Sequence, residues 1–337
     1  MGTEPFASLP RVRLVHGPTP IVHHARLSER LGLDLWIKRD DMTGNAEGGN
    51  KLRKLEFLLG EARAQGADTV LTCGDIQSNH ARATAIVCAS IGLSCEVFLR
   101  ADDAIAAAPM SGNSFLCRLA GAKIRLISKD QYRNRAALMQ DAARVAEHRG
   151  AKPYVIPEGG SNGLGSLGYV EAMREVRDQL RLGLAGKRGF DLVAVACGSG
   201  GTTAGLALGA AMYGVAQEVR AYAVCNDTPY FNATVRRIIG ECRAIIASLP
   251  EPVPVVVDDT AKGPAYAVPT EAQVRFIVDV ARSTGLIFDP VYTGKALQGL
   301  AESVRKDGSL LGKRVLFVHT GGVAAALAHT DVFEGQA

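Results

Sequence analysis

Short runs of β-branched residues alternate with stretches rich in alanine and leucine along almost the whole chain. The candidate strands include residues 35–38, 69–73, 95–99, 123–126, 153–156, 192–196, 220–224 and 315–319. The candidate helices include residues 51–64, 80–91, 133–148, 169–182, 202–212, 271–283 and 294–306. Because parallel strands are joined by crossovers that are usually helical, this alternation predicts an α/β fold with mostly parallel sheets. The 337 residues are enough for two such domains.

Charge and hydropathy argue against nucleic-acid and membrane partners. Lysine and arginine exceed aspartate and glutamate by only four, and the basic residues are spread along the chain. No stretch approaches the roughly 20 apolar residues that cross a bilayer, and the first residues lack the apolar core of a secretory signal. The seven cysteines form no Cys-x-x-Cys pair. We therefore expect a cytoplasmic protein with reduced thiols and no metal site.

The first motif with chemical potential is Gly48-Gly49-Asn50-Lys51, at the start of a predicted helix. Ligands of open α/β sheets bind beyond the carboxyl ends of strands, where strands give way to helices. The two glycines allow a tight turn there. The positive end of the helix dipole lowers the pKa of a lysine in the first turn, and only a neutral amine attacks a carbonyl. Lys51 is thus a candidate Schiff-base lysine; the alternative is a solvated basic face shared with Arg53 and Lys54.

A second motif, Gln77-Ser78-Asn79-His80, follows the predicted strand at 69–73. Four consecutive polar side chains at a helix start can bind a carboxylate or a phosphate. The simpler interpretation is that Ser78 or Asn79 only caps the helix.

The third motif runs from Gly198 to Thr203, between a predicted strand and a predicted helix. Its small residues leave backbone N–H groups open toward an anion. It lacks the Gly-Lys-Ser/Thr of a Walker A loop. It therefore suits a phosphomonoester, although a tight turn alone explains it too.

The fourth motif places Tyr292 just before a helix, as a possible acid or base, and Thr320 at the end of a strand.

Together and in this order, the four motifs resemble the 1-aminocyclopropane-1-carboxylate deaminase and D-cysteine desulfhydrase family. That family belongs to the fold-type II, tryptophan synthase β-like enzymes that depend on pyridoxal 5′-phosphate (PLP). The resemblance extends from about Leu14 to Val332. It is densest at residues 36–41, 48–57, 77–80, 153–157, 159–161, 289–295 and 319–322.

The resemblance implies roles for individual residues around PLP. Lys51 matches the lysine that holds PLP and moves the Cα proton of the substrate. Asn79 matches a residue near the phenolic oxygen of the cofactor, and Thr320 the partner of its pyridine nitrogen. The residues implied for the phosphate are Gly198, Ser199, Gly200, Gly201 and Thr202.

The resemblance also implies a substrate site. Ser78 matches the group that receives the substrate carboxylate and is expected to take part in catalysis with Lys51. Tyr266 and Tyr292 match two active-site tyrosines. The residues expected to bind the substrate are Ser78, Asn79, His80, Gly160 and Ser161.

The implied architecture has two three-layer α/β domains with the cofactor between them. The smaller domain, residues 52–161, is inserted into a large PLP-binding domain formed by residues 1–51 and 162–337. The glycine-rich stretch 162–168 is expected to be the connection that crosses between the domains. The family resemblance further implies a homodimer.

The residue after Tyr292 guides the choice of reaction. Deaminases that open the cyclopropane ring resemble one another in having glutamate there, whereas this chain has Thr293. A carboxylate near the pyridine nitrogen of PLP would favour its protonation and strengthen the ring as an electron acceptor, which ring opening demands. With Thr293 and Thr320 the pyridine is expected to be neutral. A neutral pyridine favours α,β-elimination, which needs less electron withdrawal by the ring. The expected reaction is therefore that of a D-cysteine desulfhydrase acting on a small, D-configured amino acid, with pyruvate, ammonia and sulfide as products.

Three alternatives stay open. The chain could be a 1-aminocyclopropane-1-carboxylate deaminase, or an L-cysteate sulfo-lyase, which residues 78–82 also resemble. It could also be a catalytically weak protein that binds an amino acid or PLP on the same fold. Two further residues, Glu47 and Asp75, place carboxylates near the expected site, where many relatives have small residues. Either could alter the pocket.

Overall fold

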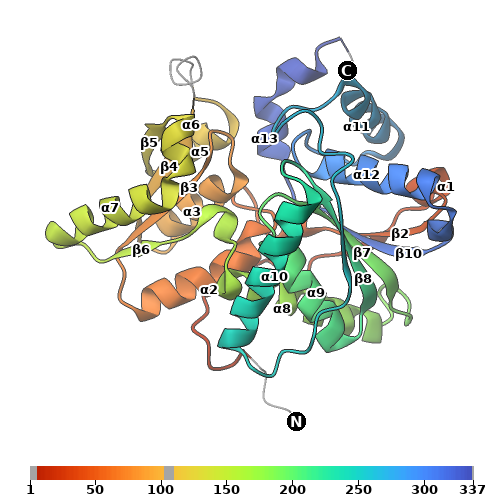
Figure 1. Cartoon of the computed structure of the whole chain (residues 1–337), viewed down its shortest axis with the longest axis horizontal. Helices are drawn as coiled ribbons and strands as arrows, with labels where there is room; N and C mark the ends of the chain where they lie inside the picture. The colour runs from red at the N-terminus through yellow and green to blue at the C-terminus, as the bar shows by residue number, and fades with distance from the viewer. Residues whose placement is uncertain (1–5, 102–109, 336–337) are drawn as a thin grey trace.

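The computed structural model describes residues 6–101 and 110–335, and it contains two sheets (Figure 1). The larger sheet has the strand order β1-β2-β10-β7-β8-β9. Its strands are β1 (Ile21–His23), β2 (Asp34–Lys38), β7 (Phe190–Cys197), β8 (Ala216–Ala223), β9 (Val255–Asp258) and β10 (Arg314–Val318). Strand β1 runs antiparallel to β2, and the other described pairs of this sheet are parallel.

The smaller sheet has the order β5-β4-β3-β6, and its described pairs are all parallel. Its strands are β3 (Thr69–Asp75), β4 (Ser94–Arg100), β5 (Lys123–Ile127) and β6 (Pro153–Val155). The predicted α/β class with mostly parallel sheets is confirmed. Strands β1 and β9 lie outside the predicted segments because they are short and have little pattern of their own.

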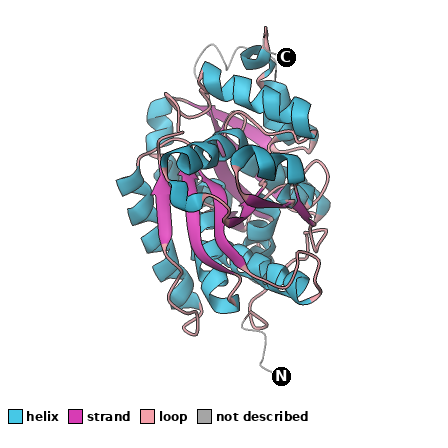
Figure 2. Ribbon diagram, turned by 90° about the vertical axis from the view of Figure 1, so that its right-hand side faces the viewer, coloured by secondary structure: helices cyan, strands magenta, loops and turns pink. Residues whose placement is uncertain are grey.

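Helices cover both faces of each sheet (Figure 2). The helices are α1 (Ala25–Leu31), α2 (Lys51–Ala64), α3 (Asn79–Ser90), α5 (Gly112–Leu119), α6 (Lys129–Arg133), α7 (Arg135–His148), α8 (Gly163–Arg181), α9 (Gly201–Tyr213), α10 (Thr228–Ile245), α11 (Glu271–Thr284), α12 (Thr293–Lys306) and α13 (Val323–Ala328). Short 3-10 turns occupy Asp40–Met42, Glu158–Gly160, Gly308–Leu310 and Thr330–Phe333. In β7, Val193 and Val195 pack toward α8 and α9, while Leu192 and Ala194 pack toward α1, α11 and α12. This alternation produces the predicted three layers.

The stretch 162–168 was expected to be a connection, and that expectation is wrong. It forms the start of helix α8, because the Asn162 side chain accepts from the N–H of Gly165 at 2.9 Å and caps the helix. The glycines serve close packing. A Cβ on Gly168 would lie 2.0 Å from the carbonyl oxygen of Arg53, so only glycine lets α8 approach α2 this closely.

A buried group of charges fixes the beginning of α2. Arg53 donates to both carboxylate oxygens of Asp40 at 2.7 Å and to Glu175 at 3.1 Å. Tyr169 also donates to Asp40 at 2.7 Å. Although burial opposes its ionisation, the guanidinium of Arg53 lowers the pKa of Asp40 to about 2. These bonds join the 3-10 turn Asp40–Met42 and helix α8 to the first turn of α2, which carries Lys51.

We propose the division into domains of residues 1–51 with 162–337 and residues 52–161. The four strands of the smaller sheet fall inside 52–161, and the strands of the larger sheet fall outside it. One buried cluster nevertheless crosses this division, because Leu55 and Leu58 of α2 belong to it together with Val70 of β3 and Val170 of α8. The two regions therefore share part of their apolar core.

Candidate active site

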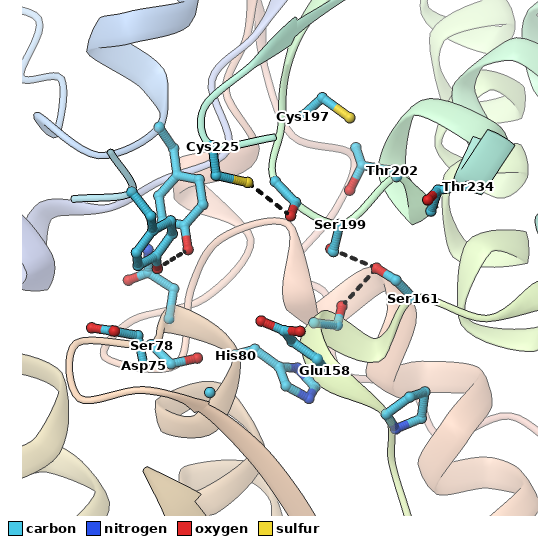
Figure 3. Close-up of a pocket in the computed structure, with 18 of the residues that line it drawn as sticks. Asp75, Ser78, His80, Glu158, Ser161, Cys197, Ser199, Thr202, Cys225 and Thr234 are labelled. Carbon is cyan, nitrogen blue, oxygen red and sulfur yellow. Dashed lines mark hydrogen bonds between the residues drawn. The ribbon is translucent and has the colours of Figure 1, made fainter. Parts of the chain in front are cut away.

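A cavity of about 880 Å³ lies where the carboxyl ends of strands from both sheets face each other (Figure 3). Its wall is formed by the ends of β3, β4, β7, β8 and β10 and by the first turns of α2, α3 and α9. The sequence-predicted residues that line it are Lys51, Ser78, Asn79, His80, Ser161, Gly198, Ser199, Gly200, Thr202, Tyr266, Tyr292 and Thr320. Gly160 and Gly201 do not line the cavity and lie directly behind lining residues.

Lys51 is the first residue of α2, as the sequence predicts. Its Nζ donates to Oδ1 of Asn50 at 3.0 Å, and Nδ2 of Asn50 donates to the hydroxyl of Thr202 at 3.1 Å. Burial, followed by the positive charge of Arg82, lowers the pKa of Lys51 to about 8. The lowered pKa was predicted, but it was attributed to the helix dipole. At pH 7 part of this amine is therefore neutral and able to react with a carbonyl.

Arg82 is a buried cation that was not predicted as a site residue. It is 5% exposed and donates to the carbonyl oxygen of Gly48 at 2.6 Å, while its Nε has no partner among the described residues. Burial lowers the pKa of Arg82 to about 10. The guanidinium thus holds the turn before Lys51 and places a positive charge near its amine.

Ser78 is the N-cap of α3, and its Oγ accepts from the N–H of Ala81 at 3.2 Å. The capping interpretation left open by the sequence therefore applies. Gly74 makes room for it, since a Cβ there would lie 2.3 Å from this oxygen. Oδ1 of Asn79 accepts from Nδ2 of the buried Asn113 at 3.0 Å. Because the first N–H groups of a helix lack intrahelical partners, this end of α3 also offers donors to an anion.

His80 lies in the wall of the cavity and is 2% exposed. The hydroxyl of Thr72 donates to the carbonyl oxygen of Ile156 at 2.9 Å, so Nε2 of His80 donates to that hydroxyl at 2.8 Å. Nδ1 is then an acceptor, and it has no partner in the described part of the chain. Burial, together with Lys51 and Lys54, keeps the pKa of His80 well below its usual value. The imidazole is therefore neutral.

The predicted glycine-rich loop joins β7 to α9. Gly200 is the N-cap of α9 with φ +80°, a conformation that favours glycine. A side chain in place of these glycines would also take up the space beside the loop; a Cβ on Gly198 would lie 3.0 Å from Cε1 of Tyr292. The N–H groups at the start of α9 and the hydroxyls of Ser199 and Thr202 therefore surround a space suited to a phosphate.

Lys54 of α2 lies behind this loop, outside the cavity lining, and was not predicted as a site residue. It is 1% exposed, and its Nζ donates to Oγ of Ser161 at 2.9 Å; Ser161 in turn contacts Oγ of Ser199 at 2.7 Å (Figure 3). A Cβ on Gly201 would lie 2.8 Å from this amine. Lys54 follows Lys51 by three positions and shares its helix face, which is the signal that could have identified it. Burial keeps the pKa of Lys54 well below its usual value, and an anion in the loop would favour its protonated form.

Tyr266 and Tyr292 meet in the wall, as the sequence predicts. Their hydroxyls form a hydrogen bond, and their rings pack edge to face with centroids 5.8 Å apart. Burial raises the pKa of both phenols; Tyr292 adds to the rise for Tyr266, whereas the hydrogen bond with Tyr266 opposes the rise for Tyr292. Both side chains therefore remain protonated, and the phenol that accepts in their mutual hydrogen bond can donate to a group in the cavity.

Thr293 and Thr320 occupy different surroundings. Thr293 is fully buried, and its hydroxyl donates to Oδ1 of Asp289 at 2.6 Å, so it stabilises the start of α12 and does not line the cavity. The same carboxylate accepts three backbone N–H groups of the residues that follow. Thr320 does line the cavity, and its carbonyl oxygen accepts from the N–H of Asn50 at 3.1 Å. The end of β10 is thereby held beside Lys51.

Comparison with known proteins decides the family. Residues 12–321 match the family described as pyridoxal-phosphate dependent enzymes. The chain belongs to this family. It is 44% identical over 323 residues to the bifunctional D-cysteine desulfhydrase/1-aminocyclopropane-1-carboxylate deaminase of Arabidopsis thaliana mitochondria, covering 94% of this chain and 79% of that protein. It is 37% identical over 337 residues to a D-cysteine desulfhydrase of Klebsiella pneumoniae, covering 98% and 99%.

A solved structure described as an ACC deaminase homologue superposes with a TM-score of 0.87 at 35% identity, covering 99% of this chain and 98% of that one. The predicted family resemblance and fold type are thus confirmed. The family requires PLP, and the site fits this cofactor. The amine of Lys51 suits its aldehyde, while the glycine loop and Thr202 suit its phosphate, with the positive charge of Lys54 behind the loop at Ser161.

No helix in the described ranges is both long enough and apolar enough to cross a membrane.

Proposed function

We propose that this enzyme is a carbon–sulfur lyase that performs α,β-elimination on small amino acids, with D-cysteine as the preferred substrate. The observation that carries the proposal is one cavity that combines the Lys51 amine, the polar start of α3 and the Tyr266–Tyr292 pair. The Lys51 amine can remove a proton, the start of α3 can bind a carboxylate, and the tyrosine pair can protonate a leaving group. The names of the Arabidopsis and Klebsiella relatives support the same reaction.

Residues on opposite sides of the cavity bind the substrate carboxylate and remove the Cα proton. The N–H groups at the start of α3, with Ser78, bind the carboxylate, and Asn113 keeps Asn79 in a fixed orientation. Lys51 removes the Cα proton as a neutral amine. PLP, when bound, withdraws electrons from Cα and so acidifies that proton.

The tyrosine pair serves the leaving group. The hydroxyl of Tyr292 gives its proton to the sulfur as the Cβ–S bond breaks, the sulfur departs with the bonding electrons as hydrogen sulfide, and water returns a proton to the phenolate. Its partner Tyr266 holds this phenol in place. The remaining unsaturated amine is hydrolysed by water to pyruvate and ammonia, which completes the balance for cysteine.

Ring opening of 1-aminocyclopropane-1-carboxylate is the second candidate, and the name of the bifunctional Arabidopsis relative supports it. Against it stands Thr293, which contributes no carboxylate of its own and donates a hydrogen bond to the carboxylate of Asp289. L-cysteate sulfo-lyase activity and a purely binding function are the remaining alternatives.

A panel of substrates separates these functions. The holoprotein is incubated with D-cysteine, β-chloro-D-alanine, L-cysteate, D-serine and 1-aminocyclopropane-1-carboxylate, and keto acid, sulfide and sulfite are measured. We expect pyruvate and sulfide in equal amounts from D-cysteine. Formation of 2-oxobutyrate from 1-aminocyclopropane-1-carboxylate, with no sulfide released from D-cysteine, would support the deaminase instead. A protein that stays colourless with added PLP would leave only the binding function.

We also propose that the protein is a cytoplasmic homodimer. The seven cysteines are all free, as in a reducing compartment. Helices α5 and α13 pack together and expose Phe115, Leu119 and Leu327, which are 48%, 70% and 69% exposed. Such apolar surface is typical of a subunit interface. Light scattering of the holoprotein gives the mass directly: twice 35.6 kDa is expected, and the mass of one chain would exclude the dimer.

A further inference from the structure

Asp75 is the last residue of β3 and lines the cavity beside Ser78 (Figure 3). The strand register places it opposite Arg100, the last residue of the neighbouring β4. Nε and Nη2 of Arg100 donate to Oδ2 of Asp75 at 3.0 and 2.5 Å. Both side chains are mostly buried, with 17% of Asp75 and 27% of Arg100 exposed. The two parallel strands therefore deliver an ion pair to the wall of the site.

Arg100 also faces the tyrosines. Its guanidinium lies 5.5 Å from the ring centre of Tyr266 and 5.2 Å from that of Tyr132. Tyr266 bonds to Tyr292, which donates toward the leaving group in the proposed reaction. The ion pair thus belongs to the part of the wall beside which the β-substituent of the substrate departs.

The other arginines of the described wall are paired with carboxylates as well. Arg135 contacts Glu158 at 2.8 Å, and the more exposed Arg133 contacts Asp130 at 2.7 Å. Arg237 pairs with Glu241. Within residues 6–101 and 110–335, no arginine that lines the cavity is left without a carboxylate partner.

We propose that Asp75 determines specificity for the β-substituent of the substrate. By neutralising Arg100, Asp75 makes the site accept a neutral substituent, such as a thiol or a bound chlorine atom, and disfavour an anionic one, such as a sulfonate. A sulfonate that leaves water needs a compensating cation, whereas a protonated thiol needs none. Asp75 would also repel such an anion directly. This inference rests on the proposed α,β-elimination and names its class of leaving group.

The test compares binding of D-cysteate with binding of D-alanine, which has the same configuration but no anionic β-substituent. Both are titrated into the holoprotein and followed by the change in the visible spectrum of bound PLP, so no turnover is needed. We expect the Asp75→Asn variant to improve affinity for D-cysteate relative to D-alanine by about tenfold or more, because one charge of a nearby pair is removed. Asp75→Asn/Arg100→Gln should return the ratio toward that of the wild type.

A matched control is Asp130→Asn, which removes the charge of the carboxylate paired with Arg133 on the same cavity wall; because this pair is 77% and 84% exposed, solvent screens its charges. It should leave the ratio unchanged. Asp75→Ala provides a second variant if the asparagine protein folds poorly. Equal weakening of both ligands would mean that Asp75 only positions Tyr266, and an unchanged ratio would also overturn the proposal.

Turnover distinguishes this inference from the proposed function. Elimination of chloride from β-chloro-D-alanine by the wild type establishes the reaction class independently of Asp75. If chloride is released and the affinity ratio does not respond to Asp75→Asn, only the specificity inference fails. If no β-substituted alanine is turned over, the proposed function fails, whatever the binding ratio.

Discussion

At the residue scale, the chemistry depends on how neighbouring side chains adjust Lys51 and the tyrosine pair. The motif before Lys51 predicted its place at the start of a helix, and that position is confirmed. Its surroundings could not be predicted, because Arg82 and Thr202, from other elements, bond the residues just before it in the chain. Lys54 was treated as part of a possible basic surface for the same reason: its partner Ser161 is 107 residues away in sequence.

The pKa of Lys51 predicts how fast PLP binds at different pH values. Burial and Arg82 lower this pKa to about 8, so the reactive neutral amine becomes predominant as the pH rises through 8. The rate at which apoprotein acquires its visible band should rise with a midpoint near pH 8 and then level off. In Arg82→Gln the midpoint should move up by about one unit, because a like charge is removed. A midpoint near 10 in the wild type would contradict this assignment.

The role of Tyr292 predicts a dependence on the leaving group. Tyr292→Phe removes the hydroxyl that donates toward sulfur, so kcat for D-cysteine should fall by about 100-fold or more. Chloride leaves without a proton, and kcat for β-chloro-D-alanine should fall far less. The visible band of the variant should match that of the wild type. An equal loss for both substrates would assign Tyr292 to a step that they share.

At the scale of elements, close packing of glycine-bearing helices places the site between the two sheets. The sequence pattern located most strands and helices correctly, since each carries its own hydrophobic pattern. It failed at residues 162–168, where three glycines resemble a flexible connection. Two of them, Gly163 and Gly168, lie against Glu241 of α10 and Arg53 of α2, and contacts between such distant segments leave no local signal.

The space around each helical glycine predicts opposite outcomes for two glycine-to-alanine changes, one where α8 packs against α2 and one in α10. Gly168→Ala would place a Cβ 2.0 Å from the carbonyl oxygen of Arg53, so it should destabilise the fold by about 1–3 kcal/mol. Gly240→Ala, in α10, meets no atom within 4 Å and should stabilise by about 0.5–1 kcal/mol through helix propensity. Chemical denaturation of both variants measures the difference. Equal effects would show that α2 and α8 are less tightly packed.

At the scale of the whole molecule, the buried cluster that joins α2, β3 and α8 links the two regions. The family resemblance implied two α/β domains with one inserted into the other. The sequence did not indicate that helices of both regions share a buried cluster, because hydrophobic periodicity reports which face of an element is buried and not what covers it.

The shared core predicts a single unfolding transition. Trp36, the one tryptophan, lies in β2 of the larger sheet, so its fluorescence reports on that sheet, while far-ultraviolet circular dichroism reports on all helices. In urea both signals should change at the same midpoint. Separate midpoints would mean that residues 52–161 unfold independently.

The most direct test of the central claim, that Lys51 holds PLP, is to reduce the holoprotein with borohydride and identify the modified lysine by peptide mass spectrometry. Lys54 makes this test demanding, because it lies three residues away, is buried and has a lowered pKa as well. We predict that the phosphopyridoxyl group is found on Lys51, and that Lys51→Ala yields no modified peptide. Modification of Lys54 or of any other lysine in the wild type would contradict the proposed active site.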